Sequence, residues 1–343
     1  MPKKVTPLSE FGEFGLIDHI TNDFKKVNKE TIYGIGDDAA VLEYKDKKVL
    51  ITTDLLVEGI HFNLIYTPLK HLGYKAVVVN LSDIVAMNGT PKQITFSLAV
   101  SSKFSVEAIE ELYEGVKLAC KKYNVDLIGG DTSSSLTGLL ISVTAIGEAN
   151  EQTIVYRNGA KDTDLICVSG DLGAAYMGLQ LLEREKSVFS ETSHIQPDLS
   201  GYDYILERQL KPEARIDITK ILQEKGILPT SMIDISDGLS SELLHICKQS
   251  KTGCRIYTEK IPIDAETCKM ANEFNISPET AALNGGEDYE LLFTIPITDF
   301  EKVKSIKGIS VIGNITNASE DLNLISPEGN FIQITAQGWN AIK

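Results

Sequence analysis

Residues 69–87 read LKHLGYKAVVVNLSDIVAM and predict one long helix with a buried face. Apolar side chains recur at steps of three and four, the spacing of one helix face, at Leu69, Leu72, Ala76, Val79 and Met87. Asp83 occupies the position of this stripe between Val79 and Met87. A buried carboxylate is costly unless it is paired or bound to a metal. Asp83 is therefore either a metal ligand or an acid that caps the helix end.

Helical and strand patterns alternate on both sides of this helix, and they predict an α/β or α+β fold with mixed sheets. Helical periodicity also marks residues 8–20, 105–123, 172–184, 216–224 and 239–247. Runs rich in β-branched residues predict strands at 49–53, 94–100, 139–146, 165–168, 291–297 and 309–312. The polar stretch 185–204 predicts a surface loop or short insertion.

Length and charge limit the function classes. The 343 residues suggest two domains, with a boundary that we place between 1–150 and 151–343. The net charge of −15 argues against nucleic acid or an anionic membrane surface as a partner, because both would be repelled. The sequence has no apolar run of transmembrane length and no signal-peptide core near its start. Five scattered cysteines without a CxxC motif favour a reduced, cytoplasmic compartment.

Many of the acids lie beside glycines or at the ends of apolar runs. They occur in GIGDDAAV (34–41), the Thr52-Thr53-Asp54 end of a predicted strand, LIGGDT (127–132), SMIDISDG (231–238) and NGGEDYEL (284–291). Strand ends with glycine turns are where open α/β sheets bind ligands. Neighbouring carboxylates repel unless a cation lies between them. Each segment alone could be an ordinary turn, but the set predicts a site for Mg²⁺, Mn²⁺ or Ca²⁺, which prefer oxygen ligands.

The common nucleotide-binding motifs are missing from the sequence. There is no GxxxxGK[ST] loop, no GxGxxG after a strand and no protein-kinase motif set. If phosphates bind, Mg²⁺ held by aspartates must carry most of the positive charge. Arg157 lies in a glycine-containing junction from which it could reach a phosphate, although it could equally be a solvated surface arginine.

Six blocks, in order, resemble the thiamine-monophosphate kinase family. They are GIGDDAAV (34–41), TTDLLVEGIHF (52–62), YKAVVVNLSDIVAM (74–87), LIGGDT (127–132), IDISDGL (233–239) and GGEDYEL (285–291). The resemblance implies the two-domain fold of aminoimidazole ribonucleotide synthetase, in which the N-terminal sheet domain forms the dimer and a C-terminal α/β domain closes the site. It also implies Mg²⁺-dependent, direct in-line transfer of the ATP γ-phosphoryl group to thiamine monophosphate, giving thiamine diphosphate and ADP.

The resemblance further implies a role for each matching position. The implied Mg²⁺ ligands are Asp38, Thr52, Thr53, Asp54, Asp83, Asp131, Asp234 and Asp237, with Asp37 ranked below them. The implied ATP contacts are Gly130, Asp131, Arg157 and Ser236, with Tyr113 as a weaker candidate. The implied contacts to thiamine monophosphate are His61 and Glu287. Trp339, the only tryptophan, either stacks on the thiamine rings or packs at the C-terminus.

Several alternatives remain open. A hydrogenase-maturation enzyme of the same superfamily should end in cysteine, whereas this chain ends in Lys343. A selenophosphate synthetase should carry a reactive cysteine or selenocysteine near its start, whereas the first cysteine here is Cys120. Aminoimidazole ribonucleotide synthetase itself lacks the His61-Phe62 and GGEDY patterns. A non-catalytic Ca²⁺-binding module would be expected to carry an EF-hand-like DxDxDG run, which is missing from the sequence.

Overall fold

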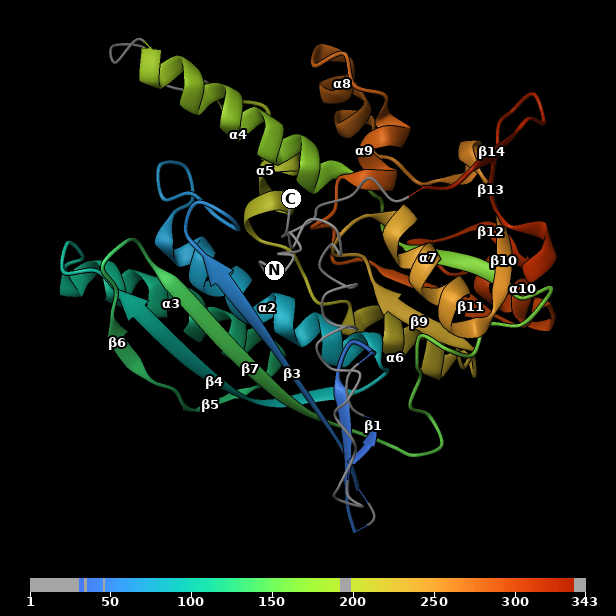
Figure 1. The fold of residues 1–343 in the computed structure, drawn as a ribbon, viewed down its shortest axis with the longest axis horizontal. Coiled ribbons are helices and arrows are strands. Elements are labelled where there is room, and N and C mark those ends of the chain that lie inside the picture. Colours follow the sequence, from blue (N-terminus) through green and yellow to red (C-terminus); the bar gives the residue numbers. More distant parts are fainter. Residues whose placement is uncertain (1–30, 34–35, 46, 192–198, 336–343) are drawn as a thin grey trace, which may run out of the picture.

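A computed structural model of the chain, which describes residues 31–33, 36–45, 47–191 and 199–335, contains two sheets that lie side by side (Figure 1). The first sheet follows the order β1-β2-β3-β7-β4-β5, and β6 also pairs with β4. Its strands are β1 (Thr31–Tyr33), β2 (Ala40–Tyr44), β3 (Lys47–Val57), β4 (Thr90–Val100), β5 (Asp126–Gly129), β6 (Thr132–Ser134) and β7 (Leu140–Ala149). β5 and β6 run parallel to β4, and the other neighbours are antiparallel.

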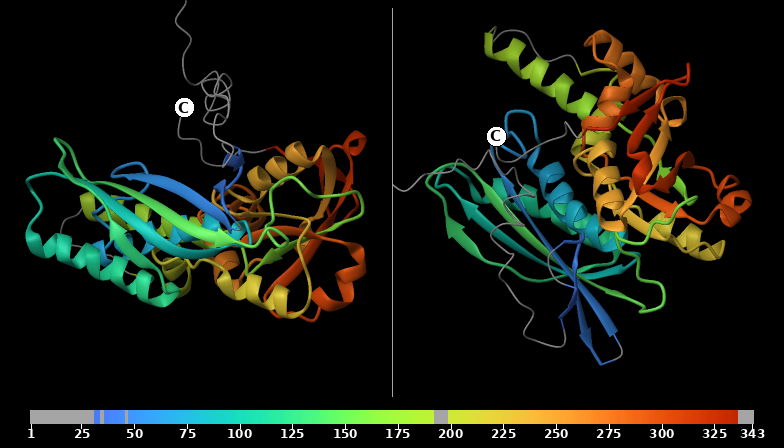
Figure 2. Two further views of the ribbon diagram at one scale, coloured as in Figure 1. Left: turned by 90° about the horizontal axis from the view of Figure 1, so that it is seen from below. Right: turned by 45° about the vertical axis from the view of Figure 1, so that its right-hand side comes forward.

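Helices α2 (Leu69–Ala86) and α3 (Val106–Tyr123) cover one face of the first sheet (Figure 2). Strand side chains alternate between the two faces, and those that face the helices are buried, as Leu50, Phe96 and Val143 illustrate. The opposite face, called the open face below, carries no helix among the described residues. The two helices cross closely, because a Cβ at Gly115 would lie 1.8 Å from the Lys70 carbonyl oxygen.

The second sheet follows the order β14-β13-β10-β12-β8-β11-β9. Its strands are β8 (Leu165–Ser169), β9 (Ser231–Asp234), β10 (Thr252–Tyr257), β11 (Leu291–Ile295), β12 (Ile309–Asn317), β13 (Leu322–Ile325) and β14 (Phe331–Gln333). Strands β9 and β11 are buried along their whole length, which is typical of strands covered on both faces. The helices are α4 (Ala174–Glu191), α5 (Asp203–Leu210), α6 (Ile216–Glu224), α7 (Leu239–Ser250), α8 (Ala265–Glu273), α9 (Pro278–Asn284) and α10 (Phe300–Val303).

Helix α2 joins the two halves of the molecule. It packs against β3, β4 and β7 of the first sheet and also against β9 of the second. One buried apolar cluster continues across this contact, since it includes Leu81 and Met87 of α2 together with Met232 of β9 and Phe293 of β11. The two sheets are therefore held in one arrangement by a shared core, which the buried apolar area stabilises.

The predicted α/β class with mixed sheets is confirmed, and so are the predicted helices and strands that fall on described residues. The helix predicted at 8–20 lies outside the described residues. The prediction of a loop over 185–204 is wrong at both ends, because α4 continues to Glu191 and α5 begins at Asp203. Polar residues can continue a helix whose outer face is solvated. No helix in the described part of the chain has the length and hydropathy needed to cross a membrane.

Candidate active site between the two sheets

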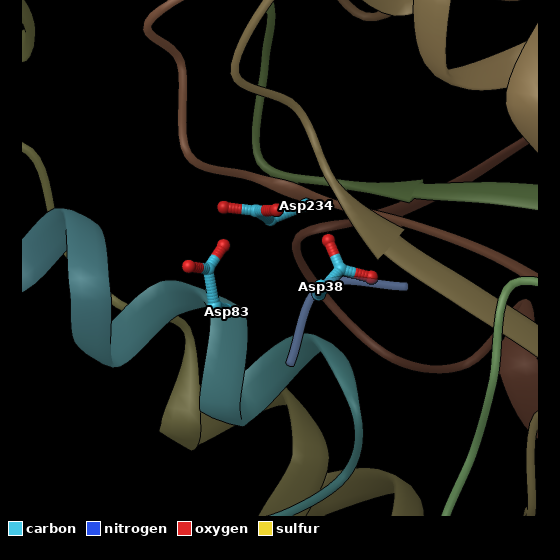
Figure 3. Close-up of side chains that lie close together, drawn as sticks. All are labelled: Asp38, Asp83 and Asp234. Carbon is cyan, nitrogen blue, oxygen red and sulfur yellow. The ribbon is translucent and has the colours of Figure 1, made fainter. Parts of the chain in front are cut away.

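Three aspartates from distant parts of the sequence converge where α2 meets the second sheet (Figure 3). Asp38 precedes β2, Asp83 lies in α2, and Asp234 ends β9. One carboxylate oxygen from each lies within 4.8 Å of the others. Asp38 and Asp234 are buried, whereas Asp83 keeps part of its surface accessible. This aspartate triad is the one group of three or more acidic, histidine or cysteine ligands found within the described residues.

Each member of the triad is oriented by a polar neighbour. Thr52 of β3 donates its hydroxyl to Asp83 Oδ2 at 2.6 Å. Arg157 makes a two-pronged contact with Asp38, Nε to Oδ2 at 2.9 Å and Nη2 to Oδ1 at 2.7 Å. Such paired contacts fix a carboxylate more firmly than single ones do. Each carboxylate oxygen can still accept a further partner, because it has two lone pairs.

The electrostatics of the triad favour a bound cation. Burial, followed by repulsion from Asp54, Asp234 and Asp38, raises the pKa of Asp83 well above its usual range. Burial and then Asp38 likewise raise the pKa of Asp234, and burial raises the pKa of Asp54 to about 6. A divalent cation between these oxygens would remove the repulsion. The donor set contains only oxygen, so the residues present fit Mg²⁺ or Mn²⁺.

Strand β3 places its predicted ligands on two faces. Thr52 and Asp54 share the face toward α2, where the Asp54 amide donates to Asn80 Oδ1 at 3.0 Å. The intervening Thr53 lies on the open face, because side chains alternate along a strand. Its hydroxyl donates to the Val143 carbonyl at 2.9 Å. The structure therefore brings Thr52 and Asp54 to the triad and does not bring the Thr53 hydroxyl there.

Two other predicted contacts lie across the first sheet from the triad. Asp131 follows β5, and its amide donates to the Ser97 hydroxyl of β4 at 3.2 Å. Strands β7 and β4 separate it from β3, so three strand spacings of about 4.8 Å put it about 14 Å from Asp54. Asp131 is exposed, and the neighbouring Gly130 is held against β4. A single chain therefore does not bring Gly130 and Asp131 to the triad.

Tyr113 lies on α3, where its ring centroid is 5.5 Å from that of Phe96. It lines a largely apolar pocket of about 530 Å³ at the start of α3, together with Phe104 and Ile109. Such pockets are typical of small-molecule sites. Tyr113 therefore packs on β4, which β7 separates from the β3 strand that carries Asp54.

The turn after Asp234 holds the predicted residues Ser236 and Asp237. Their backbone amides donate to Glu242 Oε1 at 3.2 and 2.9 Å. Glu242 is buried, and this burial, followed by repulsion from Asp237, raises the pKa of its carboxyl well above the usual range. The Ser236 carbonyl in turn accepts from the Glu287 amide at 2.7 Å. The turn and the GGEDY segment are thus joined through their backbones.

The predicted acceptor contacts lie on different elements. His61 follows β3, and its Nδ1 accepts from the Val57 amide at 3.0 Å. Glu287 lies before β11, and its Oε2 accepts from Gln209 Nε2 at 2.8 Å. Trp339 lies outside the described residues. Asp37 stays out of the triad and accepts from the Arg157 amide at 3.1 Å, while burial and then Asp38 raise its pKa to about 7.

Several residues around the site were not predicted from the sequence. Ser82 donates to Asp234 Oδ2 at 2.6 Å, and Asn80 supports Asp54. Both stand in the NLSD block beside Asp83, so their place on the predicted helix was the available signal. Tyr289 is surrounded by acids: burial, then Glu287, Asp54, Asp234 and Asp83, raise its pKa well above the usual range. No local pattern marked Tyr289 as a neighbour of Asp54 and Asp83, which lie far away in the sequence.

Comparison with known proteins finds relatives along nearly the whole chain. Residues 36–149 match the family described as AIR synthase related protein, N-terminal domain. A thiamine-monophosphate kinase of Aquifex aeolicus is 38% identical over 315 residues, covering 89% of this chain and 96% of the relative. Its counterpart from Bacillus subtilis is 33% identical over 338 residues, covering 96% and 99%.

A solved structure described as AaThiL complexed with AMPPCP and TMP aligns with a TM-score of 0.83 at 35% identity. The alignment covers 98% of this chain and 99% of that one, so both sheets and the helices between them are shared. Identity above 30% over nearly the whole length leads to one conclusion. The chain belongs to the thiamine-monophosphate kinase family.

Proposed function

We propose that this chain transfers the γ-phosphoryl group of ATP to thiamine monophosphate in a Mg²⁺-dependent, in-line reaction that gives thiamine diphosphate and ADP. The observation that carries the proposal is the aspartate triad, which draws one carboxylate from each of three distant segments to the contact between the two sheets. The names of the relatives and the AMPPCP and TMP of the solved neighbour support the choice of substrates.

Asp38, Asp83 and Asp234 would hold Mg²⁺, with Thr52 and Asp54 beside them. Asp237 follows on the same turn as Asp234. Bound there, Mg²⁺ would neutralise the phosphate oxygens of both substrates and so allow one anion to approach the other. Such cations would offset the repulsion between these anions and a chain with a net charge of −15.

The protein's own part is positioning. The acceptor phosphate has a second pKa of about 6, so its attacking oxygen is ionised near neutral pH and no general base is needed. Arg157 keeps Asp38 in place and offers a guanidinium beside the triad. Holding donor and acceptor in line within a site of fixed dipoles supplies most of the rate enhancement in such transfers.

We further propose a homodimer formed through the open face of the first sheet. Leu55 is 52% exposed there, which is unusual for a leucine in the middle of a long strand. The open face also carries the Thr53 side chain and the Ser97 hydroxyl that binds the Asp131 amide. A second copy on this face would put Thr53 and Asp131, the two predicted ligands that one chain leaves away from the triad, into the interface.

Two smaller proposals follow from the same evidence. A domain boundary at 150/151 is supported by the family match, which ends at residue 149, and by the gap between β7 and β8. A cytoplasmic location is supported by the free state of all five cysteines.

An acceptor assay tests the function. The purified chain is incubated with ATP and Mg²⁺ with thiamine monophosphate, with thiamine, or with neither, and ADP is measured. We expect ADP release that depends on thiamine monophosphate and stops when EDTA is added, with thiamine diphosphate as the product. Equal ADP release without an acceptor would contradict the proposal. Asp83→Asn should abolish turnover, whereas Glu111→Gln, an exposed acid on α3, should leave it unchanged.

A further inference from the structure

Lys75 is a buried lysine in the middle of α2, and its ammonium group contacts residues of the second half of the molecule. Its side chain is 6% exposed. The ammonium nitrogen donates to the Gln209 carbonyl at 2.9 Å and lies 3.1 Å from Glu287 Oε2. Both partners belong to the second half of the chain, in α5 and in the segment before β11.

The contacts around Lys75 converge on one oxygen of one carboxylate. Glu287 Oε2 forms the ion pair with the Lys75 ammonium, and it also accepts a hydrogen bond of 2.8 Å from the side-chain amide of Gln209. Burying a lysine is costly unless it is paired and hydrogen-bonded, and this arrangement provides both partners. The other oxygen, Oε1, has no hydrogen-bond partner among the described residues, and the Glu287 side chain is 30% exposed. Glu287 thus keeps one oxygen available for a ligand.

The backbone at Glu287 is fixed as firmly as its side chain. Its φ of 59° is in the left-handed region, which is unusual for a residue other than glycine. Its amide donates to Ser236, and a Cβ on the preceding Gly286 would lie 2.5 Å from the same Ser236 oxygen. Unfavourable backbone conformations persist where the surroundings impose them, and they concentrate at functional sites. Glu287 is therefore held at a set position relative to the turn that follows Asp234.

We propose that Lys75 is a positioning residue for the acceptor. It holds the Glu287 carboxylate turned so that Oε1 faces an N–H donor of the bound ligand, such as the amino group of an aminopyrimidine. Because the ion pair joins α2 to the second half of the chain, acceptor binding is coupled to the packing of the two halves against each other. The proposal rests on the proposed contact between Glu287 and thiamine monophosphate. An ion pair that serves stability alone would behave differently.

Four variants separate these roles: Lys75→Met, Glu287→Gln, the double variant, and Lys70→Met as an exposed control on the same helix. The dissociation constant for thiamine monophosphate is measured by calorimetry, and KM is measured for both substrates. Loss of a charge-assisted contact predicts a rise of about tenfold in the constant for thiamine monophosphate in Lys75→Met. In Lys75→Met, KM for ATP should stay within about twofold of the wild-type value. In Lys70→Met, the dissociation constant for thiamine monophosphate and KM for ATP should both stay within the same range.

The double variant decides whether Lys75 acts through Glu287. If it does, the double variant binds thiamine monophosphate no more weakly than Glu287→Gln alone. It should also unfold at a higher temperature than Lys75→Met, because it no longer contains the half-buried Glu287 carboxylate without its ion-pair partner. It therefore serves as the folded test protein if Lys75→Met does not fold. Effects of the two single changes that multiply, or an equal rise in the constants for ATP and thiamine monophosphate, would overturn the proposal.

The proposed activity is judged separately in the same experiment. If the wild type releases no ADP but Lys75→Met weakens thiamine monophosphate binding only through Glu287, the activity fails and the role of Lys75 stands. If the wild type is active but Glu287→Gln binds thiamine monophosphate normally, the activity stands and the role of Lys75 is overturned.

Discussion

Ser82 and Asp234 are joined by a hydrogen bond of 2.6 Å from Oγ to Oδ2, although 152 positions separate them in the sequence. Ser82 is fully buried and Asp234 nearly so. The serine directly precedes Asp83 in α2, so a single turn of helix supplies one acid of the triad and orients another. The geometry of the triad therefore depends on the contact between α2 and β9.

Removing this contact should weaken both stability and metal binding. In Ser82→Ala, Asp234 loses a buried hydrogen-bond donor, which costs about 1–3 kcal/mol in the free energy of unfolding. Urea denaturation measures that cost, and a Mg²⁺ titration measures the accompanying loss of affinity. If both quantities stay at their wild-type values, the hydrogen bond does not organise the triad.

Neutralising one acid of the triad should have opposite effects with and without Mg²⁺. Without metal, Asp83→Asn removes repulsion among buried carboxylates, so the variant should unfold at a higher temperature than the wild type. Mg²⁺ at one hundred times its Kd should stabilise the wild type by about 2.7 kcal/mol, and this gain should be lost in Asp83→Asn. Thermal unfolding with Mg²⁺ and with EDTA checks both effects.

Glu111→Gln removes the same charge from an exposed position on α3 and serves as the control for Asp83→Asn. It should change neither the metal-free unfolding temperature nor the response to Mg²⁺. A metal-free Asp83→Asn that is less stable than the wild type would mean that hydrogen bonding, rather than repulsion, dominates at Asp83.

Asp288 should make stability depend on pH. Burial raises its pKa to about 7, against the lowering effect of Arg208, whereas an unfolded aspartate titrates near pH 3.9. The folded state therefore holds this proton more tightly, and the contribution to stability is complete below about pH 4 and is lost as pH rises toward 7. Asp288→Asn mimics the neutral form, so its stability relative to the wild type should increase over that range.

Urea denaturation of the wild type and Asp288→Asn at pH 4, 5.5 and 7 measures this difference. Three units of pKa correspond to at most about 4 kcal/mol. A difference in the free energy of unfolding that does not change with pH would show that Asp288 is ionised throughout, held by Arg208 and the Gly173 amide.

The open face should be the dimer interface. Light scattering of the wild type should give twice the chain mass of 37.6 kDa, and Leu55→Asp should give the chain mass itself. Leu118→Asp is the matched control, because Leu118 is 45% exposed on α3, away from the open face. A dimer that persists in Leu55→Asp and dissociates in Leu118→Asp would place the interface on the helices instead.

The sequence predicted the parts of the site that depend on local periodicity. The stripe on α2 placed Asp83 on a buried face, and Asp83 does lie there with Asp38 and Asp234. Strand alternation also separates Thr52 from Thr53, but the family resemblance grouped both as ligands. The prediction for Asp131 depended on the order of strands in the sheet, which no local pattern contains.

Long-range pairing accounts for what the sequence could not predict. Lys75 stands in an apolar stretch of the sequence, and its ion-pair partner Glu287 comes 212 positions later. The extension of α4 to Glu191 was missed because residues 185–191 are mostly polar, and Val188 and Phe189, the two apolar residues among them, are exposed. The partner of Lys75 and the solvent exposure of the end of α4 are both set by the folded chain, and neither can be read from the local sequence.

Crystallography with Mn²⁺ in place of Mg²⁺ tests the central claim most directly. Crystals grown with Mn²⁺, thiamine monophosphate and a non-hydrolysable ATP analogue are measured at a wavelength where manganese scatters anomalously. We predict an anomalous peak bonded to carboxylate oxygens of both Asp83 and Asp234, one from each half of the molecule, at about 2.2 Å. Peaks confined to other surface acids at saturating Mn²⁺, with the aspartate triad metal-free, would contradict this account.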